Sequence, residues 1–549
     1  MVFHCPKQAP ALIFNITDCL YLIPLCIRYV DAMTHYFAKF LLLCTRLTGF
    51  PRPVCAPIPA PFEPRESKYT RLGQGIINEA EDHQGSSGFY LLSNGLDAFV
   101  TRLSLMEAAD QTLDVQYYLF HKDATSKLFT HYLVRAADRG VRVRLLLDDF
   151  GHYGQERLLR ALVEHPNISI RLFNPFANRK LPYLDFLTRF SKVQRRMHNK
   201  SFIADTQAAI IGGRNIGNTY FSADEYTNFT DLDVLGVGQF ATEVSTVFDL
   251  YWQHSLAVPV QDLQRRTIKL SLAGVRRKLA VRRHNKINRA YLARLADLEL
   301  VEQLKKGELK FYWAKSQLVY DHPDKLLNDC TDTRGHLAPT LDCLWQEVTT
   351  EALLVSPYFI PGDNGVATFA SWVAAGAKVT VLTNSLAAND VPLVHASYAR
   401  YRPALLNAGV QLWELQPDSK KARKSRRSRG LPSSSKASLH AKTMIFDRKI
   451  LFVGSLNLDP RSLNLNTEIG VLIHSSEIAE FASEIFLAEL PEHAWQVETN
   501  KQEGSRHQLQ WSDKSNPEAI THYQAEPQAS RWSRFRAWLF GHLPLESLL

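Results

Sequence analysis

One pattern of residues occurs twice in this chain, as HNKSFIADTQAAIIGGRN at residues 198–215 and as HAKTMIFDRKILFVGSLN at residues 440–457. Aligned without a gap, the two segments share His, Lys, Ile, Asp, Gly and Asn. Apolar residues on both sides of a short polar stretch predict a hairpin of two buried strands, with its turn at Asp205 in one copy and at Asp447 in the other. The duplication predicts a chain built from two related halves.

Each copy places a His and a Lys two residues apart, so their side chains leave the same face of a strand. Imidazole can attack phosphorus or transfer a proton near neutral pH, and Lys and Asn can donate hydrogen bonds to phosphoryl oxygens. A single His at a strand start is more often structural, but two copies with the same companions favour phosphoryl transfer. The candidate residues from the motifs are His198, Lys200, Asn215, His440, Lys442 and Asn457.

The order of the other elements repeats as well. The first half shows an apolar strand, a helical segment and a second strand at residues 113–120, 126–139 and 141–148, and the second half shows the same order at 353–360, 366–375 and 377–384. Strand, helix and strand in this order predict two α/β halves whose sheets are largely parallel and covered by helices. The two halves are expected to join about a pseudo-twofold axis.

The double pattern H-x-K-x4-D followed by G-x-x-N resembles the phospholipase D superfamily. Further segments, among them LDVQYYLFHKD (113–123), LVSPYFIPG (354–362) and SLNLDPRSLNLNTEIGV (455–471), resemble its bacterial cardiolipin synthase branch, in particular the C-type members. The resemblance covers roughly residues 70–495. It implies two phospholipase D-like repeats, each a mainly parallel sheet covered by helices, that pair their motifs into one active site.

The resemblance also implies roles for the site residues. One His becomes a covalent phosphohistidine and the other acts as general acid and then as general base. Symmetry alone leaves the choice open, and we assign the nucleophile to His198 and the acid to His440 from the family tendency. Lys200, Lys442, Asn215 and Asn457 are expected to hold the phosphoryl oxygens.

Two pairs of carboxylates accompany the motifs. Asp231 and Glu468 occupy matching places in TDLDVL (230–235) and TEIGVL (467–472), and the resemblance makes them the groups that orient the two His rings. Asp205 and Asp447 belong to the motif by name, but they are expected to be structural because they sit at the hairpin turn, away from the His face.

The predicted domain organisation follows the repeats. It comprises an apolar N-terminal membrane-associated or export segment at 1–70, a first repeat at 71–255, a basic helical connector at 256–310, a second repeat at 311–495 and a tail at 496–549. A chain of 549 residues is long enough for two such domains, each with its own core.

The charge distribution indicates an anionic partner. The formal net charge is +9, and residues 419–430, SKKARKSRRSRG, form a basic run that cannot bury itself and is expected to be a mobile loop near His440. Charge alone does not separate nucleic acid from acidic lipid. The apolar stretches at 11–27 and 36–50 each carry charges, so they suit a membrane interface or an export segment better than a spanning helix.

The C-terminal segment from Arg531 interleaves Arg with Trp, Phe and Leu. This composition is typical of a helix on an anionic membrane surface, and a terminal helix docked on the core is the alternative. Of the seven Cys, five lie in the first 55 residues, which gives no disulfide framework. No Cys or His cluster has metal-ligand spacing, so neither a metal nor another cofactor is expected.

The sequence therefore predicts a phosphatidyltransferase that makes cardiolipin from phosphatidylglycerol and a second phospholipid, either phosphatidylethanolamine or another phosphatidylglycerol, at the bacterial inner membrane. The protein is expected to be peripheral or anchored by its N-terminus, on a side that the sequence leaves open, as it does the need for a protein partner. The alternatives are a phospholipase D-type hydrolase and a nuclease, and the apolar N-terminus and aromatic tail favour lipid over nucleic acid. A second lipid site is expected around Tyr358 and the polar residues Asn384, Asp390, His395, Tyr398 and Arg402.

Overall fold

In the computed structural model, the described residues are 67 and 69–542, apart from 153–154, 180, 182, 225–226, 264–270, 284–292, 294–302, 304–308, 329–331, 418–435 and 501–507. The expected N-terminal segment up to residue 66, most of the basic connector and the basic run at 419–430 therefore lie outside the described residues. Among the described residues, no helix combines the length and apolar character needed to cross a bilayer.

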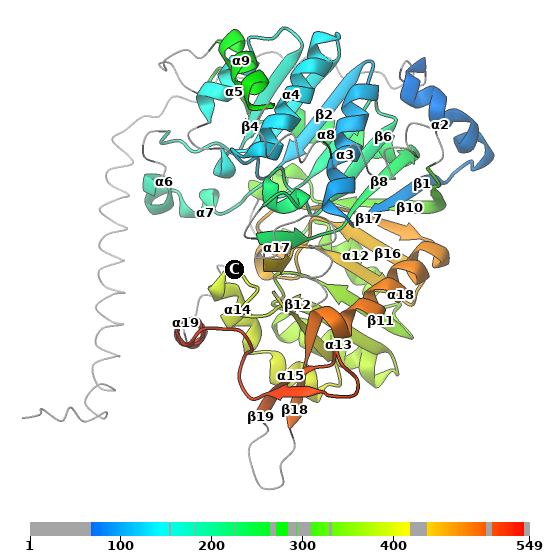
Figure 1. Ribbon diagram of the computed structural model, residues 1–549, viewed down its shortest axis with the longest axis vertical. Coiled ribbons are helices and arrows are strands. Elements are labelled where there is room, and N and C mark those ends of the chain that lie inside the picture. Colours follow the sequence, from blue (N-terminus) through cyan, green and yellow to red (C-terminus); the bar gives the residue numbers. More distant parts are fainter. Residues whose placement is uncertain are drawn as a thin grey trace, which may run out of the picture.

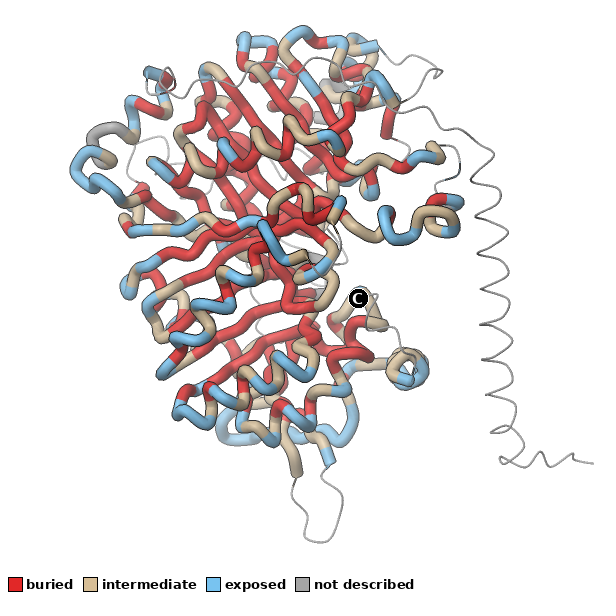
Figure 2. Tube along the Cα trace, turned by 180° about the vertical axis from the view of Figure 1, so that it is seen from behind, coloured by how far each residue is buried: buried red, intermediate tan, exposed pale blue. Residues whose placement is uncertain are grey.

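The first half is built on a sheet whose strands pair in the order β9, β4, β3, β2, β5, β6, β8 and β1. Their bounds are Ala257–Pro259, Ile168–Phe173, Arg142–Asp148, Thr112–Tyr117, Ser201–Ala204, Ala208–Gly212, Asp233–Gly238 and Ser87–Leu92. Most residues of these strands are buried, and β2, β5 and β6 are buried along their whole length (Figure 2).

Counted outward from the junction of the halves, the second half has the same order as the first. Its strands β10, β17, β16, β15, β11, β12, β13 and β18 take the places of β1, β8, β6, β5, β2, β3, β4 and β9, and β19 and β20 are added at the end. Their bounds are Tyr312–Tyr320, Ile469–His474, Ile450–Gly454, Thr443–Phe446, Glu351–Val355, Lys378–Asn384, Gln411–Leu415, Ala494–Asn500, Gln508–Asp513 and Thr521–Tyr523. β1 and β10 pair in antiparallel fashion at the junction, so the halves share one 18-stranded sheet (Figure 1).

The two-repeat α/β fold is confirmed, but the expectation of a mainly parallel sheet holds for only part of each half. Parallel pairing joins β2 to β3 and β3 to β4, and likewise β11 to β12 and β12 to β13. The remaining pairs of the large sheet are antiparallel, among them the hairpins β5–β6 and β15–β16 and the junction of β1 with β10. The sheet is therefore mixed.

Helices pack on both faces of the sheet (Figure 1). In the first half, α2 (Arg71–Asp82), α3 (Gly95–Ala108), α4 (Ala124–Asp138), α5 (Glu156–Leu162), α6 (Tyr183–Thr188), α7 (Phe190–Val193), α8 (Gln239–Gln253) and α9 (Leu272–Arg283) occur in this order. In the second half, they are α12 (Ala338–Trp345), α13 (Gly362–Ala374), α14 (Pro392–Ala399), α15 (Arg402–Asn407), α17 (Pro460–Asn464), α18 (Ser476–His493) and α19 (Arg531–Gly541).

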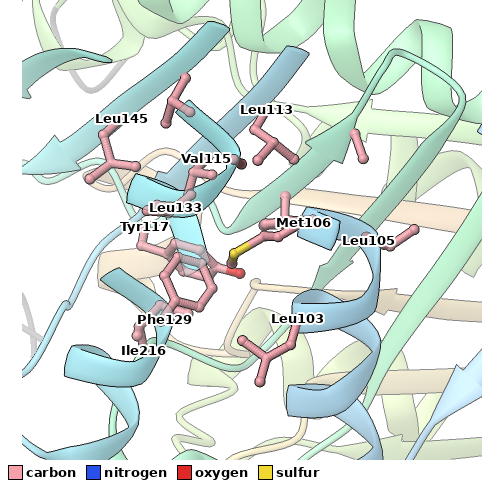
Figure 3. Packing of buried hydrophobic residues seen from close by; sticks show 14 of the residues in the cluster. Leu103, Leu105, Met106, Leu113, Val115, Tyr117, Phe129, Leu133, Leu145 and Ile216 are labelled. Atoms are coloured by element: carbon pink, nitrogen blue, oxygen red, sulfur yellow. The ribbon is translucent and has the colours of Figure 1, made fainter. Parts of the chain in front are cut away.

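The apolar core divides between the faces. On one face of the first half, Phe129 and Leu133 of α4 and Met106 of α3 pack against Leu113 and Val115 of β2 (Figure 3). On the other face, α8 and α18 contribute to one cluster that also contains strands of both halves. This shared cluster fixes the halves against each other, because it buries apolar surface from both.

The predicted hairpins are confirmed, with turns at the two Asp residues. Asp205 and Asp447 have φ of 50° and 51°, a left-handed conformation that Asp tolerates better than most residues. The Asp205 carboxylate accepts three backbone N–H groups at the start of β2, and Asp447 does the same at the start of β11. Each turn is thereby tied to the strand next to its hairpin.

Candidate active site

The two motif His residues lie just before β5 and β15, and the backbone of the opposite half holds each of them. The His198 N–H donates to Thr467 O at 2.9 Å, and the His440 N–H donates to Thr230 O at 2.8 Å. A small parallel sheet of β7 (Thr227–Thr230) and β14 (Lys436–Leu439) extends the second of these contacts. The halves therefore exchange backbone hydrogen bonds at the site.

The side chains follow the same crossed arrangement. The Nδ1 of His198 lies 2.8 Å from Glu468 Oε2, and the Nδ1 of His440 lies 2.7 Å from Asp231 Oδ2. Both carboxylates are buried. Because Nδ1 of each ring is engaged by a carboxylate, Nε2 is the ring nitrogen left for chemistry.

The two motif Lys residues are buried beside the His residues. Lys200 Nζ donates to His198 O at 2.6 Å, while Lys442 Nζ donates to His440 O and lies 3.0 Å from His440 Nδ1. Burial lowers the pKa of Lys200 to about 7 and that of Lys442 to about 8, although nearby carboxylates oppose the effect. The protonated forms of these Lys residues are therefore stabilised when an anion binds beside them.

Burial and the Lys residues also act on the His rings. Burial, followed by Lys200 and Lys442, lowers the pKa of His198 well below its usual value. Burial and then Lys442 lower the pKa of His440 as well. Lys442 affects both rings, as expected if the two motifs form one electrostatic unit.

The two carboxylates differ in their pKa. Burial raises the pKa of Glu468 to about 7, even though Lys200 opposes this. Burial also favours the neutral form of Asp231, but His440 and Lys442 outweigh it and lower the pKa of this carboxyl. Asp231 is therefore the more firmly ionised of the pair.

The motif Asn residues make different contacts. Asn215 accepts from the Leu119 N–H at 3.0 Å and donates to the Tyr220 hydroxyl at 3.0 Å. Asn457 donates weakly to Ser462 Oγ at 3.4 Å, and its buried Oδ1 has no partner among the described residues. Asn215 is thus held by its own half, whereas Asn457 is less constrained.

The structure adds neighbours that the motifs do not name. The Tyr118 ring lies 5.1 Å from the His198 ring, and the Tyr220 and Phe229 rings lie 5.1 Å and 5.0 Å from the His440 ring. Tyr118 follows directly on β2, so an aromatic residue just after a strand end was the available sequence signal. Ser455 Oγ donates to Glu468 Oε2 and thereby helps to fix the position of that carboxylate.

Most of the residues expected in a second lipid site have other partners. His395 is buried against Glu526 and Arg402, and Arg402 also binds Glu414, which accepts from Tyr398. These side chains form a buried network, so the expectation that they line a lipid site is wrong. Buried polar groups need such partners, and a helical polar pattern does not reveal them.

The remaining candidates lie nearer the motif residues. Asn384 exchanges hydrogen bonds of 3.0 Å and 2.8 Å with the backbone of Leu439, next to His440, and is therefore structural. The Tyr358 hydroxyl donates to Asp390 at 3.0 Å, and Tyr358 is half-buried whereas Asp390 is exposed. In the described part of the chain, no group of three or more His, Cys, Asp or Glu residues is arranged to hold a metal ion.

Comparisons with known proteins agree with this fold. The family described as "Cardiolipin synthase, PLD-like domain" matches residues 103–252 and 345–490. The chain is 39% identical over 481 residues to cardiolipin synthase C of Escherichia coli (strain K12), an alignment that covers 87% of this chain and 100% of that protein.

More distant matches extend the comparison. Cardiolipin synthase 2 of Bacillus anthracis is 24% identical over 392 residues, which cover 70% of this chain and 61% of that protein. The crystal structure of phosphatidylserine synthase from Haemophilus influenzae Rd KW20 shares the fold, with a TM-score of 0.54, 13% identity and coverage of 87% of this chain and 100% of that one. The chain therefore belongs to the family of cardiolipin synthases with phospholipase D-like domains.

Proposed function

We propose that this protein is a cardiolipin synthase, which transfers a phosphatidyl group from one phospholipid to the glycerol headgroup of phosphatidylglycerol. The observation that carries this proposal is the crossed pairing of His198 with Glu468 and of His440 with Asp231. This arrangement provides two oriented imidazoles in one site, as a two-step transfer requires. Family membership and the similarity to a protein named cardiolipin synthase C support the lipid substrate.

In the first step, the Nε2 lone pair of His198 attacks the phosphodiester phosphorus. The bond from phosphorus to the departing alcohol oxygen breaks, and that oxygen takes a proton from His440 Nε2. Glu468 at Nδ1 stabilises the His198 ring as positive charge develops on it. The product is a phosphatidyl group bound covalently to His198.

In the second step, His440 Nε2 removes a proton from the hydroxyl of the incoming phosphatidylglycerol. The resulting oxygen attacks phosphorus while the bond to His198 Nε2 breaks, which releases cardiolipin and restores both His residues. If water takes the place of the lipid alcohol, the product is phosphatidic acid. The synthase function therefore requires an acceptor site that competes well with water.

The electrostatics of the site favour an anionic substrate. Lys200 and Lys442 lower the pKa of both His rings in the free protein. A bound phosphodiester offsets the Lys charges, so it raises the pKa of His440 and favours the protonated form that acts as the acid. Asp231, with its lowered pKa, stabilises that imidazolium. Lys200, Lys442 and the Asn457 amide are the groups we assign to the phosphoryl oxygens.

Asp205 and Asp447 have a structural role in this proposal, because their carboxylates are occupied by backbone N–H groups. The donor is phosphatidylglycerol or phosphatidylethanolamine, and the proposed place of action is the bacterial inner membrane, where the protein is bound peripherally or through its N-terminal segment. Anionic phospholipid is the proposed partner, and nucleic acid is not favoured.

The test incubates the purified full-length protein with labelled phosphatidylglycerol, alone and with phosphatidylethanolamine. We expect labelled cardiolipin, with glycerol released from a phosphatidylglycerol donor or ethanolamine from the other donor. His198→Ala serves as the inactive control. Cleavage of nucleic acid without any lipid product would overturn the proposal, and phosphatidic acid as the sole product would replace it with hydrolysis.

A further inference from the structure

Large apolar side chains are exposed on two helical elements, one in each half of the molecule. Around α6 and α7 these are Leu181, Leu184, Leu187 and Phe190, and on α19 they are Trp532, Phe535, Trp538 and Leu539. Leu187 is 63% exposed and Trp532 is 65% exposed. Clusters of large exposed apolar side chains of this kind usually mark an interaction surface.

The helix α19 turns its apolar face away from the protein. Trp532, Phe535 and Trp538 form a stacked row with ring centroids 5.5 Å and 6.0 Å apart. A helix that docks on a protein core normally buries this kind of face. Here hydrogen bonds from Arg side chains attach α19 to the protein, while Trp532, Phe535 and Trp538 stay exposed and available to another partner.

Those polar contacts hold α19 firmly. Arg534 donates to Glu526 O at 2.7 Å, and Arg400, next to α14, donates to Gly541 O at 2.8 Å. The Glu526 side chain is itself bound by buried His395 and Arg402. His395 and Arg402, which were expected in a second lipid site, therefore hold the segment that leads into α19.

Both elements connect to the active site. From α6, a series of ring contacts runs from Phe186 through Phe176, Phe150 and Tyr118 to His198, with centroids 6.1, 6.4, 6.1 and 5.1 Å apart. Phe150 is itself exposed. The apolar surface of the first half thus leads directly to the proposed nucleophile.

In the second half, α19 packs beside α14, and Asp390 lies just before α14. Asp390 accepts from Tyr358 and is close enough to Lys442 to act on its pKa. Figures 1 and 2, which view the molecule from opposite sides, show α6, α7 and α19 along the same edge, with one group in each half.

The charges on these elements favour an anionic partner. Arg189 and Lys192 accompany the first group, and Arg531 and Arg536 accompany the second. Asp185, the acidic residue of α6, is buried and accepts from Asn178, and α19 contains no acidic residue. Aromatic and apolar side chains flanked by Arg and Lys are typical of elements that lie in a phospholipid interface.

We propose that α6 and α7, together with Leu181, and α19 form one bilayer docking surface, which sets the active site against an anionic phospholipid membrane. The surface contacts lipid at two points, one from each half, so that the junction of the halves, where the motif residues lie, faces the headgroups. The inference rests on the proposed function only in taking lipid as the substrate. Membrane binding is measured without turnover, so the two proposals fail independently.

The test measures binding of the full-length protein to vesicles of phosphatidylglycerol and phosphatidylcholine and to vesicles of phosphatidylcholine alone. The variants are Trp532→Ser/Trp538→Ser and Leu184→Ser/Leu187→Ser. The matched control is Ile485→Ser, because Ile485 is 50% exposed on α18, away from the proposed surface. We expect each double variant to weaken binding to the anionic vesicles by about tenfold or more and the control to stay within about twofold.

Transfer on short-chain substrate dispersed in detergent should remain near the parent level in both double variants, because neither surface touches the reacting atoms. Unchanged vesicle binding in both variants overturns the proposal. If binding is unchanged and the melting temperature falls, another part of this chain or a second copy covers the surface, which also overturns it.

A second measurement needs no substitution. Amide hydrogen exchange of the parent protein should slow at residues 181–193 and 531–541 when anionic vesicles are added, and α18 should exchange as before. Protection that omits both segments would overturn the proposal even if the variants had failed to fold.

Discussion

The two halves place their His and Lys residues alike but surround the two carboxylates differently. Position 213 is Gly, where an added Cβ would lie 2.2 Å from Asp231 Oδ1, whereas the matching Ser455 donates a hydrogen bond to Glu468. Arg214 beside Asp231 helps to lower its pKa, and the matching residue is Leu456. Duplication therefore fixes where the motif His and Lys residues lie, while these local differences set how firmly each carboxylate is ionised.

This difference suggests a division of labour between the halves. His440, paired with the more firmly ionised Asp231, is the better candidate to hold a proton, and His198, paired with Glu468, is the better nucleophile. The same assignment follows from the family resemblance.

The largest effect is expected from removing either ring. His198→Ala and His440→Ala should each lower transfer by about 10⁴-fold or more, since each removes one part of a two-step mechanism. Product formation from labelled phosphatidylglycerol measures the loss, and circular dichroism checks the fold. With a donor whose leaving alcohol needs no proton, His440→Ala should still form the covalent intermediate and His198→Ala should not. The reverse result would exchange the roles of the two halves.

The carboxylates should give a smaller loss. We expect Asp231→Asn and Glu468→Gln to reduce transfer by about 10²- to 10⁴-fold, because an amide does not stabilise the charged ring and can favour the wrong tautomer. With the donor whose leaving alcohol needs no proton, the loss of activity in Asp231→Asn should become smaller, because Asp231 assists His440 as the acid. The loss of activity in Glu468→Gln should stay the same. If both variants respond equally to this donor, the two His residues do not have separate roles.

The same pair should change stability in opposite directions. The pKa of Glu468 is raised from 4.5 to about 7, so the folded protein binds more protons than the unfolded chain between these values, and stability falls as pH rises through this window. Glu468→Gln should therefore stabilise the protein at pH 8, by up to about 3 kcal/mol, and much less at pH 4. The pKa of Asp231 is lowered, so its contribution is present above the ordinary Asp value and lost as pH falls below it.

Asp231→Asn should accordingly destabilise the protein at neutral pH. Urea unfolding of the parent and both variants at pH 4 and pH 8 measures these changes. A loss of stability in Glu468→Gln that is the same at both pH values would show that the asymmetry between the carboxylates is absent.

The hairpin turns should respond through stability rather than chemistry. Asp205→Ala removes an acceptor for three backbone N–H groups at a buried position, so we expect a loss of about 2 to 4 kcal/mol in unfolding free energy. Asp447→Ala should cost less, because its surroundings are more exposed. The specific activity of the folded fraction should stay within about threefold of the parent in both variants. A selective loss of activity at full stability would give these residues a catalytic role.

The smallest effect concerns the choice of acceptor. Tyr358 is half-buried beside Asp390, and the corresponding residue of the first half is Leu119. Each of the two directly precedes a Phe that forms an isolated β-bridge, Phe359 with Leu458 and Phe120 with Ile216. We expect Tyr358→Phe to lower the ratio of cardiolipin to phosphatidic acid by about twofold, because the loss of its hydroxyl loosens the acceptor side. His395→Ala, which disturbs the buried network, is expected to lower stability without changing that ratio. An unchanged ratio in Tyr358→Phe would remove this residue from acceptor choice.

Much of the molecule was predictable from particular residues. The family and the two-repeat α/β fold are confirmed, and so are the hairpin turns at Asp205 and Asp447. The network around His395 was not predictable, because its partner Glu526 lies 131 positions away in sequence. For α19, the composition left open a helix on a membrane surface and a helix docked on the core. In the structure its polar side contacts the protein and its aromatic side is exposed.

By itself, the sequence determined the two hairpins, the His and Lys pairs and the duplication, because these depend on turn chemistry and apolar patterning within a few residues. Tertiary structure alone decided that each ring is oriented by the carboxylate of the opposite half, across 270 positions for His198 and 209 for His440. That crossing depends on the edge pairing of β1 with β10 and on the apolar cluster that both halves share. Such contacts between distant residues form only when the two halves join in one register, and no local pattern specifies that register.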